Sequence, residues 1–170
     1  NTVMKKYSIT LLAAIMILSS CENDSNKEES PELVVNENAA TFKEIGSITI
    51  GGAGAAEISA YDEVSKKLFT VNNSNTNRID VIDLSNPSSP VFLTSIDLTP
   101  FNGASNSVAT YNGKLAVALE AKPNKQDAGK VVVFDTSNYS VIKEITVGAL
   151  PDMITFSLDG NFIMTANEGE

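Results

Sequence analysis

Three short stretches of similar sequence recur at a fixed interval of 47 residues, and this spacing constrains the fold more than any other feature. They begin at Leu68, Leu115 and Phe162, and each is an apolar run that ends in a polar residue. The stretches that follow the first two, residues 78–83 and 130–135, also correspond, because both end in aspartate before a polar turn. A repeat of this length is the size of one four-stranded blade of a β-propeller.

The pattern from residue 42 onward is typical of antiparallel strands. Short runs rich in Val, Ile, Thr and Phe are separated by Asn, Gly, Asp, Ser and Pro, and no segment has a sustained helical period. The tightest connections are expected at Asn112-Gly113 and Asp159-Gly160, since both pairs tolerate positive φ. The predicted strands cover residues 42–50, 57–61, 68–72, 78–84, 91–98, 107–111, 114–120, 130–135, 141–147, 153–157 and 161–167.

The predicted fold class is all-β, a partial β-propeller with about two and a half four-stranded antiparallel blades. One blade covers residues 57–98, a second covers 106–147, and a third begins at Asp152 and holds two strands. A β-sandwich would also account for the strands, but it gives no reason for the regular interval. Because a ring needs at least ~4 blades, we expect a longer natural protein. Residues 42–50 resemble 141–147, and we expect them to form an outermost strand that completes the last blade.

The N-terminal region has the features of an export signal. Lys5 and Lys6 precede an apolar run at residues 9–18, which is shorter than the ~20 residues that span a bilayer. The sequence Leu18-Ser19-Ser20-Cys21 resembles the lipobox of bacterial lipoproteins, in which the cysteine is diacylated and the preceding peptide is removed. We therefore predict a signal peptide at residues 4–20 and a lipid anchor on Cys21. The alternative is a buried cysteine after an amphipathic helix.

Residues 21–41 are charged and poor in groups that could pack, which predicts a disordered tether before a propeller domain at residues 42–170. Acidic residues after the lipidated cysteine resemble the surface-export signals of some Gram-negative lipoproteins. We therefore expect an exported protein anchored to the outer membrane, at the cell surface or on the periplasmic face, with the membrane as a partner.

The composition excludes several functions. The chain holds 21 Asp and Glu against 12 Lys and Arg, and a surface so acidic repels nucleic acid. It has no histidine and one cysteine. Its own residues therefore cannot form a Ser-His-Asp triad, a His-ligated zinc site or a Cys-His nucleophile.

Two groups of surface proteins resemble this sequence. Residues 72–85 resemble the repeats of bacterial propellers named for their Tyr-Val-Thr-Asn motif. A closer resemblance, over residues 42–170, is to the N-terminal half of choice-of-anchor I proteins, which are similar to mesenchyme-specific cell surface glycoproteins. It is carried by residues 52–61, 77–81, 106–109 and 147–153, and by Ala-Asn-Glu-Gly-Glu at 166–170. The resemblance implies an extracellular, anchored propeller, and some relatives are labelled phosphatase-like.

Polar residues are expected to gather at one face of the propeller, because first strands start where second strands end. The first-strand starts hold Glu57, Asn106 and Asp152, and the second-strand ends hold Asn72, Glu120, Asn167 and Glu168. Carboxylate oxygens suit Ca²⁺ or another divalent cation, so the candidate metal ligands are Glu57, Glu120, Asp152 and Glu168. The candidate ligand-binding amides are Asn72, Asn106 and Asn167. Alternatively, these side chains cap strand ends and bond exposed backbone where blades meet.

Two functions follow from this arrangement. The leading hypothesis is a binding or scaffold module for a glycan, a peptide or a mineral. The alternative is a metal-dependent phosphoesterase, similar to alkaline phosphatase or phytase, with its site at the propeller channel. In that case the ion would neutralise the charge of the phosphoester and activate water.

Overall fold

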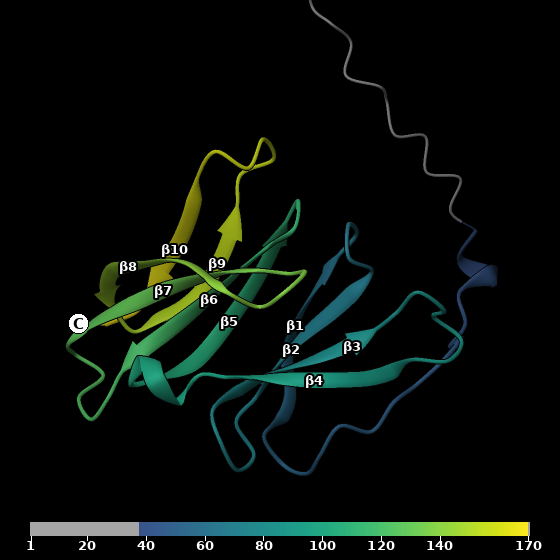
Figure 1. Cartoon of the computed structure of the whole chain (residues 1–170), viewed down its shortest axis with the longest axis horizontal. Coiled ribbons are helices and arrows are strands. Elements are labelled where there is room, and N and C mark those ends of the chain that lie inside the picture. The colour runs from purple at the N-terminus through teal and green to yellow at the C-terminus, as the bar shows by residue number, and fades with distance from the viewer. Residues whose placement is uncertain (1–37, 170) are drawn as a thin grey trace, which may run out of the picture. The chain divides into compact units, whose positions relative to one another are not determined.

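The computed structural model describes residues 38–169, and Phe42–Glu170 forms one compact unit. It holds three antiparallel sheets in succession along the chain, each a blade of a β-propeller (Figure 1). Blade 1 contains β1 (Ala55–Asp62), β2 (Lys67–Asn72), β3 (Arg78–Asp83) and β4 (Val91–Asp97). Blade 2 contains β5 (Gly103–Tyr111), β6 (Lys114–Ala121), β7 (Ala128–Asp135) and β8 (Val141–Ala149), and blade 3 contains β9 (Pro151–Phe156) and β10 (Ile163–Asn167).

The strands follow one another in chain order within each sheet, as in an up-and-down blade. The helical elements of the described part are two short 3₁₀ turns, Ala39–Thr41 and Thr99–Phe101. Across residues 38–169, no helix is both long and apolar enough to cross a membrane. The all-β prediction and the four-stranded blades are therefore confirmed, whereas residues 4–20 and Cys21 lie outside the described residues.

Ten predicted strands are confirmed, with ends that differ by at most four residues. The strand predicted at residues 42–50 is wrong, since these residues form no ladder with any described strand. A strand needs a partner edge for its backbone groups, and this segment instead crosses blade 1. There the carbonyl of Ile50 accepts a hydrogen bond from Asn72 Nδ2 at 3.2 Å. Gly46 lies close against Pro87 and Pro90.

The hairpin between β5 and β6 has the predicted two-residue turn. Tyr111 pairs with Lys114, and the two residues between them have positive φ, 43° at Asn112 and 78° at Gly113. Positive φ at both central residues defines the type I′ turn, which matches the twist of the flanking strands. Asp159-Gly160 lies instead in a longer loop, where the backbone N–H of Ser157 donates to the carbonyl of Phe162 at 3.0 Å.

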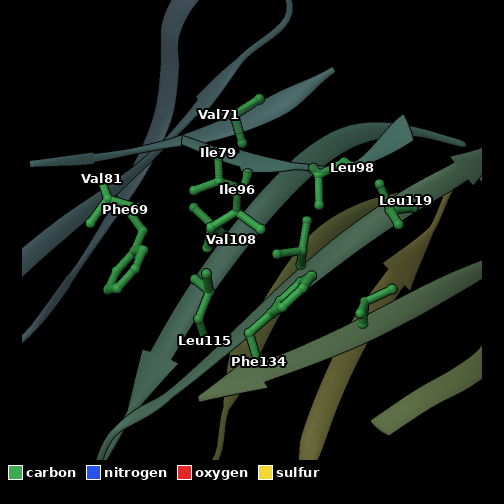
Figure 2. Close-up of a cluster of buried hydrophobic side chains, with 12 residues drawn as sticks. Phe69, Val71, Ile79, Val81, Ile96, Leu98, Val108, Leu115, Leu119 and Phe134 are labelled. Atoms are coloured by element: carbon green, nitrogen blue, oxygen red, sulfur yellow. The ribbon is translucent and has the colours of Figure 1, made fainter. Parts of the chain in front are cut away.

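The core lies between the blades, and blade 2 contributes to both interfaces. On β6, Leu115, Val117 and Leu119 pack with blade 1, whereas Ala116 and Ala118 pack with blade 3. Strand alternation explains this, because successive side chains point to opposite faces of a sheet. Figure 2 shows the larger cluster, which joins Phe69, Val71, Ile79, Val81, Ile96 and Leu98 of blade 1 to Val108, Leu115, Val117, Leu119, Val132 and Phe134 of blade 2.

The first strand of each blade lies beside the first strand of the next. β1 neighbours β5, and β5 neighbours β9. A direct bond joins the first pair, since Thr110 Oγ1 donates to the carbonyl of Tyr61 at 2.7 Å. In a propeller the strands that adjoin in this way line the channel, so residues at the two ends of β1, β5 and β9 lie at its two mouths.

Candidate binding site at the ends of the inner strands

The three inner strands share a backbone irregularity near their starts. In β5, Ser105 and Ser107 pair with consecutive residues of β6, so Asn106 has no partner opposite it. In β9, Asp152 is skipped in the same way, and Glu57 lies inside the longer irregularity of β1. Such β-bulges change the direction of the side chain that they carry. The predicted first-strand residues therefore occupy corresponding positions in three successive blades.

The predicted second-strand residues lie beside these bulges. Asn72 and Asn167 each pair with the residue just before the bulge of the neighbouring strand, and Glu120 pairs with Ala104, two residues before Asn106. Glu168 follows directly, and its backbone N–H donates to the carbonyl of Leu150 at 2.9 Å. The structure thus brings all seven predicted residues to the same end of their blades, but it gives them different surroundings.

Asn72 is fully buried, and its side chain is saturated with hydrogen bonds. Its Nδ2 donates to Asp80 Oδ2 at 2.6 Å and to the carbonyl of Ile50 at 3.2 Å. Its Oδ1 accepts from the backbone N–H of Ser74 at 3.1 Å and from Ser74 Oγ at 2.7 Å. An amide side chain can form about four hydrogen bonds, so Asn72 keeps none for a ligand here. In this structure it fastens the β2–β3 loop and residues 42–50 to blade 1.

Asn106 joins blade 2 to blade 3. Its Nδ2 donates to Glu120 Oε2 and to the carbonyl of Pro151, both at 3.3 Å. Glu120 is 5% exposed, and the Nζ atom of Lys125 reaches its Oε2 at 3.1 Å. The two blades approach closely here, because a Cβ atom at Gly129 would lie 2.5 Å from Pro151 Cδ. Asn106 and Glu120 therefore contact each other at the place where blades 2 and 3 join.

The β2–β3 loop makes the corresponding junction between blades 1 and 2. Asn77 Nδ2 donates to the carbonyl of Gly103 at 2.7 Å, and its Oδ1 accepts from the backbone N–H of Ser105 at 2.9 Å. Asn73 Nδ2 donates to the carbonyl of Ser105 at 3.0 Å and reaches Glu57 Oε2 at 3.4 Å. The sequence analysis missed both asparagines. The signal that could have identified them is the run of amides in the turn at residues 72–77.

The remaining predicted residues face solvent. Glu57, Asp152, Asn167 and Glu168 are exposed. Across residues 38–169, no three acidic side chains lie close enough together to bind one metal ion. Calcium requires six to eight oxygen ligands, so the four predicted carboxylates do not by themselves supply a site for it. A metal at Glu57, Glu120, Asp152 and Glu168 stays a prediction.

At the opposite end of the inner strands, Asp62 joins blade 1 to blade 2. Its Oδ2 accepts from Ser65 Oγ at 2.7 Å, from the backbone N–H of Ser65 at 3.0 Å and from Thr136 Oγ1 at 2.8 Å. Its Oδ1 accepts from the backbone N–H of Gly113 at 3.2 Å. Burial acts to raise the pKa of Asp62, but these hydrogen bonds outweigh it and hold the pKa below its ordinary value.

Asp80 is the second buried carboxylate of blade 1, on the face turned away from blade 2. It accepts from Ser95 Oγ at 2.7 Å and from Asn72 Nδ2 at 2.6 Å, and it pairs with Arg78 Nε at 2.8 Å. Burial acts to raise the pKa of Asp80, but these three donors and the charge of Arg78 lower it by more. The pKa of Asp80 is therefore below its ordinary value. The nearby hydroxyl of Thr70 is buried without a hydrogen-bond partner among the described residues.

A cavity of about 460 Å³ opens at the Asp62 end of the inner strands. The residues that line it come from the end of β1 and from the end of β5 with its hairpin: Tyr61, Asp62, Glu63, Thr110, Tyr111 and Asn112. The repeat pattern did not predict this cavity, because the polar positions that it brings together lie at the opposite ends of these strands.

Comparison with known proteins places the chain in a family. The choice-of-anchor I domain matches residues 57–170, as the resemblance predicted. Among solved structures, the Kuenenia stuttgartiensis Hydrazine Synthase is similar, with a TM-score of 0.50 and 18% identity over 67% of this chain. The match covers 31% of that chain, and at this identity it supports the fold alone. No curated protein matches the sequence. The chain belongs to the choice-of-anchor I domain family.

Proposed function

We propose that this propeller is the binding or scaffold module of a lipoprotein that is exported and anchored to the outer membrane through Cys21. Membership of the choice-of-anchor I family supports a surface-associated or exported β-propeller. The lipid anchor rests on the residues around Cys21 in the sequence, which lie outside the described part of the chain.

The repeated bulge of the inner strands is the observation that carries the proposal. It sets Glu57, Asn106 and Asp152 at the same end of three blades, and two of these side chains are exposed carboxylates. The buried amides at this end are occupied by the blade junctions, so the exposed acids stand on a rigid frame. Groups held by rigid strands are positioned better than groups on loops.

This end of the propeller offers hydrogen-bond acceptors above all. The exposed carboxylates of Glu57, Asp152 and Glu168 accept hydrogen bonds from hydroxyl or amide groups, and Asn167 both donates and accepts. A glycan, a peptide or the cations of a mineral surface would satisfy these groups. None of these ligands requires a nucleophile-base pair.

Binding of the full-length protein to immobilised glycans, peptides and calcium mineral tests the proposal. The double variant Glu57→Gln, Asp152→Asn removes two exposed charges, and we expect it to bind its ligand about five- to thirtyfold more weakly, since each lost charge-assisted contact is worth about 0.5–1 kcal/mol at an exposed site. Glu144→Gln is the matched control, because Glu144 is an exposed glutamate on β8. Binding to a glycan or a peptide should survive a chelator.

The phosphoesterase alternative makes the opposite prediction for the same protein. Hydrolysis of a generic phosphoester by the metal-loaded full-length protein, lost in chelator and lost again in Glu168→Ala, would contradict a purely binding role.

A further inference from the structure

We propose that the cavity at the Asp62 end of β1 and β5 binds an organic cation, a guanidinium or ammonium group. This cavity lies at the opposite end of the inner strands from Glu57, Asn106 and Asp152. The proposal therefore goes beyond the function proposed above and does not depend on it.

Two tyrosines form the aromatic part of the cavity, one from each of two adjoining inner strands. Tyr61 is 48% exposed, so about half of this residue is open to a ligand. Tyr111 is held from behind, because its ring lies at 5.8 Å from that of Phe156 and directly against Gly160. A cation within about 6 Å of a tyrosine ring is attracted by the negative face of the ring. The cavity thus has one accessible ring and one that is fixed in place.

The charged groups that line the cavity are both acidic. Glu63 is exposed, and its side chain forms neither a hydrogen bond nor an ion pair with any of residues 38–169. Asp62 is buried beside it, and the hydrogen bonds to its carboxylate keep it ionised. None of the six lining residues is basic. Three lysines flank the cavity without lining it: Lys66 and Lys114 are exposed, and Lys67 is engaged, since its Nζ donates to the carbonyl of Thr136 at 2.9 Å and lies 4.7 Å from the ring centre of Tyr139.

The cavity has no cationic group to balance an anion, and its side-chain donors are the hydroxyls of Tyr61 and Tyr111 and the amide of Asn112. The hydroxyl of Thr110 is already donated to the carbonyl of Tyr61. The backbone N–H of Gly113 and the hydroxyl of Thr136 donate to Asp62 from the other side. The cavity therefore presents to a ligand the unpaired carboxylate of Glu63, the buried negative charge of Asp62 and two tyrosine rings. This combination favours a cation over an anion or a neutral apolar group.

A guanidinium or ammonium group reaches such a cavity from two sources. It is carried by a small amine in solution, or by an arginine or lysine side chain of a basic partner. The acidic balance of the whole chain, with a formal net charge of −9, attracts either of them. The volume of about 460 Å³ accommodates a single side chain of this kind.

The test measures binding to the full-length protein by calorimetry or by NMR titration. The first probe is N-acetylarginine amide, and its matched control is N-acetylcitrulline amide, which has nearly the same shape but no charge. A short peptide with one central arginine provides the second arm. We expect the arginine probe to bind and the citrulline probe to bind at least about tenfold more weakly, with the affinity for arginine falling as salt is added.

Variants locate the site. Glu63→Gln removes a charge and keeps the shape of the side chain, and Tyr61→Leu removes a ring face. We expect each to weaken arginine binding about three- to fivefold, the range of a single exposed ion pair or cation–π contact. Glu144→Gln should leave it unchanged. If both the small arginine probe and the peptide bind, a small cation is a sufficient ligand. If only the peptide binds, the ligand is a basic partner.

Two results would overturn the proposal: equal affinities for arginine and citrulline, or an affinity for arginine that Glu63→Gln does not change. Failure of both arms to bind would do the same. Because Glu63 is exposed, circular dichroism of Glu63→Gln should show the same fold. The Glu63→Gln variant should still bind the ligand that Glu57 and Asp152 recognise at the other end of the strands. The two proposals are therefore tested separately, since either can fail alone.

Discussion

At the scale of single residues, sequence reasoning predicted at which strand ends the polar side chains lie but did not assign what each of them contacts. It located Glu57, Asn106 and Asp152 at the starts of first strands, and the structure shows them at corresponding bulges. It did not identify Asn73 and Asn77, because their partners are backbone atoms of the next blade. Contacts between blades depend on how two sheets stack, and the spacing within one repeat does not contain that information.

Asp62 should be important for stability. Its carboxylate accepts four hydrogen bonds from both blades, and Asp62→Asn replaces one accepting oxygen by a donor that faces other donors. We expect the free energy of unfolding to fall by about 1–3 kcal/mol, the cost of leaving buried donors unpaired. Urea unfolding of the variant measures the change, and Glu144→Gln serves as the control. A variant as stable as the wild type would show that the carboxylate does not join the blades.

Stability should also depend on pH through Asp62 and Asp80. Both have a pKa below the ordinary value in the folded protein, so between the folded and unfolded pKa values the unfolded chain binds more protons. Their contribution is complete above the unfolded pKa of about 3.9, and it is lost as the pH falls through the folded pKa. Urea unfolding from pH 7 to pH 3 should show a constant free energy down to about pH 4 and a decrease below it. Asp62→Asn should show a smaller decrease.

At the scale of strands and turns, most of the structure follows from local sequence. Alternation and turn residues predicted ten of the strands, and Asn112-Gly113 forms its tight turn because both residues adopt positive φ. Residues 42–50 were predicted wrongly, since their pattern is that of a strand but they pair with none of the described edge strands. Pattern alone cannot decide such a segment, because the partner of a strand lies elsewhere in the chain.

The contact between blades 2 and 3 requires glycine at one position. In Gly129→Ala, the new Cβ would lie 2.5 Å from Pro151 Cδ and 2.8 Å from the carbonyl of Leu119. One blade must move, and overpacking of this kind costs about 1–3 kcal/mol of the free energy of unfolding. Gly52→Ala is the control, because a Cβ there meets nothing within 4 Å. Thermal or urea unfolding of the two variants compares them, and equal stabilities would contradict the close approach.

At the scale of the whole molecule, the 47-residue interval predicted the blades, and the family match supports a surface-associated or exported protein. The proposed cellular location still rests on the sequence before residue 38. The repeat could not reveal the Tyr61 and Glu63 cavity, because its lining comes from two blades, and residues of different type occupy the corresponding positions of β1 and β5.

The predicted lipid anchor has a direct test. Cys21→Ser removes the thiol that would carry the acyl chains, and each buried methylene contributes about 0.8 kcal/mol to membrane binding. We expect the variant to move from the membrane fraction to the soluble fraction of cells, and from the detergent phase to the aqueous phase on Triton X-114 partition. Ser25→Ala, a nearby change that keeps the cysteine, should stay with the membrane. A Cys21→Ser protein that remains in the detergent phase would exclude the anchor.

The unequal faces of β6 have a consequence for how such a protein evolves. One face carries Leu115, Val117 and Leu119, and the other carries Ala116 and Ala118, so blade 2 fits a different neighbour on each side. A duplicated copy of blade 2 inserted next to itself would set the face of Leu115, Val117 and Leu119 against the face of Ala116 and Ala118, a pairing that neither described interface contains. We therefore expect the number of blades to change by recombination only when a whole pair of neighbours moves together, and chimaeras that exchange single blades to fold poorly.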